Sequence, residues 1–180
     1  MTRVARFEVR QETEDDFDAV RRVHTEAFDR HDLAGARPPE VALTDELRVS
    51  SEFIPELSLV ADNGQLLVGH VMATRATVGP EASPVLLLGP LGVLPSHQRQ
   101  GVGVALMEAI IAVAESRGEP MIVLLGLPAY YQRFGFELAS YFGIEPPEAK
   151  WAPHFLVRPG RAYDRSVRGI MTYAEPFSRL

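Results

Sequence analysis

Apolar residues recur at helical spacing near the start of the chain. Their positions are Phe17, Val20, Val23, Ala27 and Phe28, which predict a helix with one buried face. The stretch 13–16 is typical of a helix start, because Thr13 can cap free amides and the three acids after it suit the helix dipole. We also predict a short strand over residues 7–10 and a second short helix over residues 40–49.

After Pro55 the pattern becomes that of strands. Residues 57–61, 66–78 and 85–93 are expected as three strands, the first two joined by an Asn63-Gly64 hairpin turn. The third is almost continuously apolar, which is typical of a strand buried on both faces. It contains Gly89-Pro90, and proline cannot donate to a strand ladder. We therefore predict a bulge there that bends the strand and splays it from a neighbour.

The next segment predicts a strand–helix–strand unit. A helix over residues 101–117 is indicated by Val102, Ala105, Leu106, Ala109, Ile110 and Val113. Gly118 and Pro120 end it, and residues 121–125 form a short strand that should run parallel to the strand before the helix. A short helix over residues 128–134 and a strand opening at Phe136 follow.

The tail offers two further strands, over residues 154–157 and 169–173, which we interpret as a C-terminal hairpin. The expected fold class is α/β (α+β mixed), with a mixed, mostly antiparallel central sheet flanked by helices. No linker or repeat divides the chain, so residues 1–180 are expected to form one domain.

The amino-acid composition limits the kinds of site and partner that the chain can have. The chain has 180 residues and no cysteine, which excludes disulfides, thiolate metal sites and a cysteine nucleophile. No His/Asp/Glu spacing suggests a metal site, and none is expected. The net charge of −6 opposes non-specific nucleic-acid binding and favours cationic partners such as amines. With no apolar run of about 18 residues and no signal-peptide core, a soluble cytoplasmic protein without a membrane partner is expected, as a monomer or a homodimer.

The segment with the most specific chemistry joins the apolar strand to the following helix. Its residues are Gln98, Arg99, Gln100, Gly101, Val102, Gly103, Val104 and Ala105. Free amides at a helix start suit a phosphate or diphosphate, and the two glycines allow a close approach. A dinucleotide site would need a third glycine where Leu106 stands, and a nucleoside-triphosphate loop would need Gly-Lys-Ser or Gly-Lys-Thr. A short diphosphate cradle of the acyl-CoA kind remains.

This segment resembles the coenzyme A signature of the GNAT superfamily of N-acetyltransferases, which reads Gln or Arg, two residues, Gly, one residue, then Gly or Ala. Gln98, Gly101 and Gly103 stand at the matching positions, after Leu91-Gly92-Val93-Leu94-Pro95. The stretch from Tyr131 to Phe136 is similar to the second signature of the family, Tyr, three residues, Gly-Phe. Pro128-Ala129-Tyr130-Tyr131 is similar to a bacterial subgroup of largely unassigned substrate. The resemblance covers roughly residues 57–138.

The resemblance implies direct transfer of an acetyl group from acetyl-CoA to a primary amine of a small molecule or peptide, in a ternary complex. The residues at 98–105 would hold the diphosphate. A backbone amide of Leu91, Gly92 or Val93 would bind the thioester oxygen, with Gly92 as the catalytic position. Tyr131 would protonate the leaving thiolate, and Tyr130 and Phe134 would complete the cofactor site.

The identity of the general base stays open. Many family members use a carboxylate on the central strands, but residues 85–93 contain no Asp or Glu. The candidates are Glu26, Glu46, Glu52 or a chain of waters. For His70 we favour a hydrogen-bonded structural role over a catalytic one.

The acceptor and the acyl length also stay open. Trp151 and His154 could line an acceptor pocket or could pack the C-terminal hairpin. The alternative to an enzyme is a non-catalytic acyl-CoA-binding module.

Overall fold

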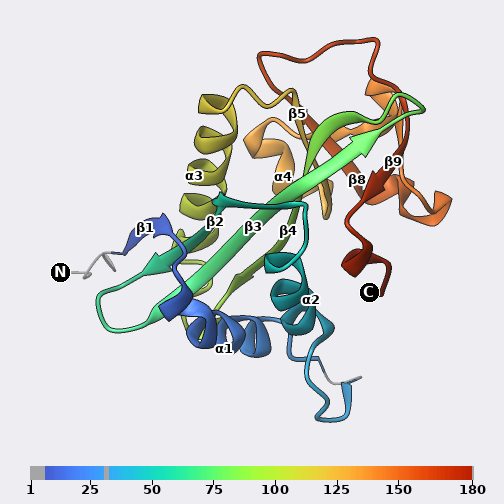
Figure 1. Ribbon diagram of the computed structural model, residues 1–180. Coiled ribbons are helices and arrows are strands. Elements are labelled where there is room, and N and C mark those ends of the chain that lie inside the picture. The colour runs from blue at the N-terminus through green and yellow to red at the C-terminus, as the bar shows by residue number, and fades with distance from the viewer. Residues whose placement is uncertain (1–6, 31–32, 180) are drawn as a thin grey trace.

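The computed structural model describes residues 7–30 and 33–179, which form one twisted sheet with helices on both faces (Figure 1). The strands are β1 (Glu8–Gln11), β2 (Phe53–Asp62), β3 (Leu67–Val78), β4 (Ser83–Val93), β5 (Met121–Leu125), β6 (Glu137–Leu138), β7 (Ile144–Glu145), β8 (Phe155–Pro159) and β9 (Gly169–Tyr173). The α-helices are α1 (Phe17–Ala27), α2 (Pro39–Arg48), α3 (Val102–Ser116) and α4 (Pro128–Tyr131). The elements predicted from the periodicity are confirmed, with small shifts at their ends.

The sheet is mostly antiparallel. Its main order is β1-β2-β3-β4-β5-β8-β6, and within it β4 and β5 form a parallel pair. That pair is short, because only Leu86 with Ile122 and Leu87 with Val123 are in register. Beyond Leu87 the edge of β4 that faces β5 has no strand partner in the described ranges. The expected mixed sheet with one splayed parallel pair is therefore confirmed.

The bulge predicted in β4 is also present. Val71 pairs with Leu91 and Ala73 pairs with Leu88, so two residues of β4, Gly89 and Pro90, stand opposite one residue of β3. The Gly89–Pro90 peptide bond is cis. A bulge bends the strand that carries it, and here it lies where β4 leaves β5.

Helices α1 and α3 cover opposite faces of the sheet, as Figure 1 shows on the two sides of the long strand β3. Two neighbouring residues of β3 show why. A side chain at Gly69 would meet Leu106 and Val102 of α3, whereas the next residue, His70, contacts His24 of α1. Successive strand residues point to opposite faces, so each helix packs against its own set of alternate positions.

The tail does not form the expected hairpin. Strand β8 pairs antiparallel with β5, whereas β9 pairs with residues 76–78 of β3, beyond the end of β2. The prediction of two strands was correct, but their pairing with each other was wrong. The long polar stretch between them allows each strand to find a separate open edge, and β9 also gains the short strand β7 as a neighbour.

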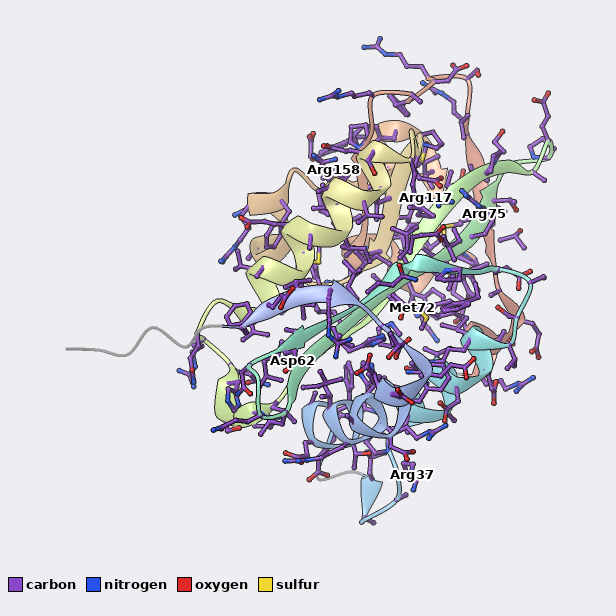
Figure 2. The ribbon with its side chains drawn as sticks, turned by 60° about the vertical axis from the view of Figure 1, so that its left-hand side comes forward. Arg37, Asp62, Met72, Arg75, Arg117 and Arg158 are labelled. Atoms are coloured by element: carbon purple, nitrogen blue, oxygen red, sulfur yellow. The ribbon has the colours of Figure 1, made fainter. Side chains whose placement is uncertain are left out.

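Ion pairs fix the C-terminal end of α3, around which Arg75, Arg117 and Arg158 gather in Figure 2. Arg75 of β3 binds the Glu119 carboxylate through two nitrogens, at 2.6 and 2.8 Å. Arg158 of β8 donates to Glu115 Oε1 at 2.7 Å and to the Phe134 carbonyl at 2.9 Å. These ion pairs involve only the C-terminal end of α3. The N-terminal end of the same helix follows the loop after β4. Among the described residues no helix is long and apolar enough to cross a bilayer.

Candidate active site

The first turn of α3 exposes backbone donors. Gly101 adopts a left-handed conformation, with φ at 87°, directly before the helix. The first helical hydrogen bond is donated by the Ala105 amide to the Gly101 carbonyl at 3.0 Å. The amides of Val102, Gly103 and Val104 therefore precede the helical ladder, at the positive end of the helix dipole. Their position fits the phosphate-binding role predicted for this loop.

Side chains of the same loop brace its backbone. Gln98 Nε2 donates to the Val93 carbonyl at 3.2 Å, and Gln100 Nε2 donates to the Ser96 carbonyl at 2.9 Å. The Gln98 amide thus holds the loop to the end of β4, and the Gln100 amide closes the loop on itself. A contribution of the two glutamines to phosphate binding stays a prediction. Arg99 is exposed and left-handed, with φ at 58°, so it remains the cationic side chain of the loop.

Tyr130 packs against the first turn of α3. A Cβ added at Gly103 would lie 3.0 Å from the Tyr130 hydroxyl oxygen, so the glycine makes room for this contact. The ring of Tyr130 also meets Phe134, with centroids 5.7 Å apart, and the Arg133 guanidinium at 4.9 Å. Tyr130 thus lies beside the loop and Phe134 packs against Tyr130; their part in cofactor binding stays a prediction.

Tyr131 points elsewhere, as expected for the adjacent residue of a helix. Its ring lies against Gly126, where an added Cβ would come within 2.3 Å of a ring carbon, and packs on Phe136 at 5.9 Å. Burial, with a smaller contribution from Tyr130, raises the pKa of the Tyr131 phenol to about 12. The phenol therefore keeps its proton at neutral pH and can act as a donor.

Tyr131 also lines a cavity of about 270 Å³ at the point where β4 and β5 separate. The bulge of β4, the end of β5, both N-terminal helices and the tail all contribute to its wall. Its lining residues are Phe28, Glu40, Leu43, Leu87, Leu88, Gly89, Pro90, Leu91, Leu125, Tyr131, Trp151, Phe155, Met171, Tyr173 and Phe177. Trp151 lines this cavity and also lines a separate shallow hollow, together with the exposed His154.

Glu40 is the carboxylate in this wall, and the sequence analysis did not single it out. It stands in the first turn of α2, where it reads as part of a helix start. Its Oε1 lies 3.7 Å from Arg30 Nη1, while its buried Oε2 has no hydrogen-bond partner among the described residues. No local sequence pattern indicates that Glu40 lines a cavity, because the apolar residues of the wall come from segments far away in the sequence.

The glutamates considered as general bases lie away from the cavity. Glu46 and Glu52 line a different surface hollow, near Val49 and Glu175. Glu26 is exposed on α1 and pairs with Arg22 at 2.8 Å. Glu40 of α2 is thus the glutamate that lines this cavity among the described residues, and the identity of the general base stays a prediction.

Four buried polar side chains form a hydrogen-bonded row that ends next to Gly92, namely Glu12, Ser58, His70 and His24. Ser58 Oγ donates to Glu12 Oε2 at 2.7 Å and lies 3.0 Å from His70 Nε2. His70 Nδ1 lies 2.8 Å from His24 Nε2. The predicted structural role of His70 is supported by these bonds. Desolvation lowers the pKa of His24 to about 3 and that of His70 well below its usual value, so both rings are neutral.

The direction of the hydrogen bonds in this row follows from the donors available. Since Ser58 gives its proton to Glu12, it accepts from His70 Nε2–H, and His70 Nδ1 then accepts from His24 Nε2–H. His24 Nδ1 is left as a lone pair with no partner among the described residues. It faces Gly92, where an added Cβ would lie 2.8 Å away. This contact requires glycine at position 92.

Comparison with known proteins gives consistent results. The family description "Acetyltransferase (GNAT) domain" matches residues 8–139. The uncharacterised N-acetyltransferase YjhQ of Escherichia coli K12 is 36% identical over 120 residues, which are 66% of this chain and 62% of that protein. YhbS of the same strain, also an uncharacterised N-acetyltransferase, is 28% identical over 145 residues, 78% of this chain and 84% of that protein.

Solved structures extend the likeness to the whole fold. The crystal structure of Escherichia coli YhbS in complex with CoA superposes with a TM-score of 0.85 at 25% identity, covering 100% of this chain and 96% of that one. A GNAT acetyltransferase of Brucella melitensis in complex with acetyl-CoA gives a TM-score of 0.76 at 27% identity, covering 96% and 99%. With a family match over most of its length and the bulged, splayed strand pair in place, this chain belongs to the GNAT acetyltransferase family.

Proposed function

We propose that this chain is an acetyl-CoA-dependent N-acetyltransferase, acting as a single domain, that transfers the acetyl group directly to a primary amine in a ternary complex. The observation that supports this proposal most directly is that two adjacent tyrosines of α4 point in different directions. Tyr130 touches the first turn of α3, and Tyr131 lines the cavity where β4 leaves β5. One short helix thus connects a diphosphate cradle with a reaction cavity. The CoA and acetyl-CoA complexes of the two structural relatives support the same assignment.

The residues present fit the cofactor. The amides of Val102, Gly103 and Val104 and the cation of Arg99 would hold the diphosphate. The unpaired edge of β4 beyond Leu87 would accept a pantetheine arm as an added strand-like partner. Acetyl-CoA supplies an activated acyl group as a thioester. A backbone amide at residues 91–93 would stabilise the oxygen on which charge develops.

Proton transfers then balance the reaction. The new bond joins the amine nitrogen to the acyl carbon, and the carbon–sulfur bond breaks. Tyr131 donates its phenolic proton to the sulfur, and the proton lost by the amine restores the phenol. Because Tyr131 is protonated at neutral pH, it has a proton to donate to the sulfur.

The test separates binding from turnover. Calorimetry should show that acetyl-CoA binds the wild-type protein, and thiol release should be measured over a panel of primary amines. Tyr131→Phe should lower kcat by roughly 100-fold or more while leaving the acetyl-CoA Kd unchanged, since loss of a general acid costs about 10²–10⁴. Tyr141→Phe, which removes the same hydroxyl group at an exposed position, is the matched control and should keep the turnover.

Two outcomes would contradict the proposal. Unchanged turnover in Tyr131→Phe would remove this residue as the acid. Acetyl-CoA binding with no turnover across the amine panel would favour the alternative, a non-catalytic acyl-CoA-binding module.

A further inference from the structure

Resting on the acetyltransferase function proposed above, we propose that the acceptor is a small amine with an apolar or aromatic substituent, whose amino group is bound by the Glu40 carboxylate. The substituent would fill the cavity beside Tyr131. Three observations support this assignment: the composition of the cavity wall, the size of the cavity, and the unsatisfied oxygen of Glu40.

The wall is apolar and rich in aromatic rings. Aromatic side chains come from the residue that caps the C-terminus of α1 and from several parts of the tail, namely Phe28, Trp151, Phe155, Tyr173 and Phe177. The rings of Trp151 and Tyr173 stack with centroids 6.5 Å apart, and Tyr173 meets Phe177 at 5.6 Å. Such walls bind apolar groups and cations, and they gain little from strongly hydrated polar ligands.

The size of the cavity sets the size of the ligand. Its volume is about 270 Å³, against the ~150 Å³ of an apolar cavity that holds benzene. Part of this space lies along the β4 edge assigned above to the pantetheine arm, and a single aromatic ring or a branched aliphatic chain on a short arm is the largest substituent expected beside it. A folded protein domain does not fit this space, so a small molecule or one terminal residue is the expected occupant.

Glu40 supplies the specificity for an amine. Its Oε1 faces Arg30 at 3.7 Å, and its Oε2 is buried with no hydrogen-bond donor from the described residues. A buried acceptor without a partner is costly, and a hydrogen bond to a charged group contributes about 1.5–3 kcal/mol. An amino group brings the donors that Glu40 lacks, and the acidic balance of the chain, −6, favours a cation as well.

The competing occupant is a longer acyl chain on the donor. An acyl chain would match the aromatic wall, but it has no N–H to offer Glu40 and would cover that carboxylate without satisfying it. Burial of the Glu40 Oε2 atom without a hydrogen-bond donor is unfavourable. The wall as built therefore fits an apolar amine better than a fatty acyl group.

Calorimetry on the protein saturated with CoA, which cannot react, tests the proposal by binding alone. The probe is 2-phenylethylamine, compared with 2-phenylethanol, which lacks the amine, and ethanolamine, which lacks the ring. We expect 2-phenylethylamine to bind at least tenfold tighter than either. Glu40→Gln should weaken that binding about 10- to 100-fold, as loss of a charged hydrogen bond predicts. Glu26→Gln, an equal change on the exposed side of α1, should leave it unchanged.

The comparison of the two phenyl compounds needs no variant, so it stays informative if Glu40→Gln fails to fold. Equal affinity for 2-phenylethylamine and 2-phenylethanol would overturn the role of Glu40. Equal affinity for ethanolamine would overturn the role of the apolar wall. Failure of the proposed function would look different, because acetyl-CoA would then either not bind or bind without turnover. The amine titration measures binding alone, and without CoA it would still test the cavity.

Discussion

His24 Nε2 and His70 Nδ1 lie 2.8 Å apart, and both imidazoles are fully buried between α1 and the sheet. The bond needs a lone pair on one of the two facing nitrogens, because a proton on both would set two N–H groups against each other. Arg48 adds a positive charge nearby, which with desolvation lowers the pKa of both rings. The pair therefore links the stability of the fold to pH.

Stability should fall on mild acidification. In the unfolded chain a histidine titrates near 6.5, whereas in the fold the pKa of His24 is about 3. Below pH 6.5 the unfolded state therefore binds more protons, and stability falls by up to about 1.4 kcal/mol per pH unit for each buried histidine. Urea unfolding between pH 7.5 and 5 measures this slope. His154→Gln, at an exposed site, should keep it, and a flat profile over that interval would contradict the buried neutral pair.

Glu12→Gln should destabilise the fold strongly. Glu12 binds the Arg48 guanidinium, and both side chains are almost completely buried. Removing the Glu12 charge leaves the buried Arg48 guanidinium with the half-exposed Asp45, at 2.6 Å, as its remaining carboxylate among the described residues, and breaking a buried pair in this way costs up to about 3–5 kcal/mol. The double variant Glu12→Gln with Arg48→Met should recover part of that loss in chemical denaturation. Glu26→Gln, which breaks an exposed pair, should cost less than about 1 kcal/mol. A similar small cost for Glu12→Gln would show that the buried pair is energetically minor.

Gly101→Val should weaken acetyl-CoA binding. The φ of 87° disfavours a β-branched residue, so the backbone before α3 must shift and its free amides move with it. We expect at least a tenfold rise in the Kd measured by calorimetry. Gly118→Val is the matched control, because Gly118 has a φ of 72° at the opposite end of the same helix. It should lose comparable stability but keep its affinity, and equal losses of affinity in the two variants would argue against a diphosphate site at Gly101.

Gly126→Ala should impair turnover through Tyr131. The added methyl would lie 2.3 Å from the tyrosine ring, so the ring must move away from its place in the cavity wall. We expect at least a tenfold loss of kcat with little change in acetyl-CoA affinity. The double variant with Tyr131→Phe should turn over no more slowly than Tyr131→Phe alone, since the two changes act on one hydroxyl group. Additive losses would mean that Gly126 acts by another route.

Much of the fold could be predicted from local rules. Helical spacing located α1 and α3, alternation and turn residues located β2 to β4, and the proline of the Gly89-Pro90 pair indicated the bulge. The loop over residues 98–105 was recognisable because its glycines and its place between strand and helix are features of contiguous residues. Such features depend on residues that are neighbours in the chain, so they can be recognised from the periodicity and from the turn residues.

The partners chosen across the sheet and the contents of the cavity depend on segments that are distant in the sequence. Strand β9 joins β3 rather than β8 because that is where an open edge remains, and no pattern within residues 169–173 encodes the choice. Glu40 shares its cavity with Phe28, Trp151 and Tyr173, which lie 12 to 133 positions away from it in the chain. The 98–105 loop could thus be found by inspection of the sequence, whereas Glu40 and the His24–His70 pair required the folded chain, since burial and missing hydrogen-bond partners are properties of packing.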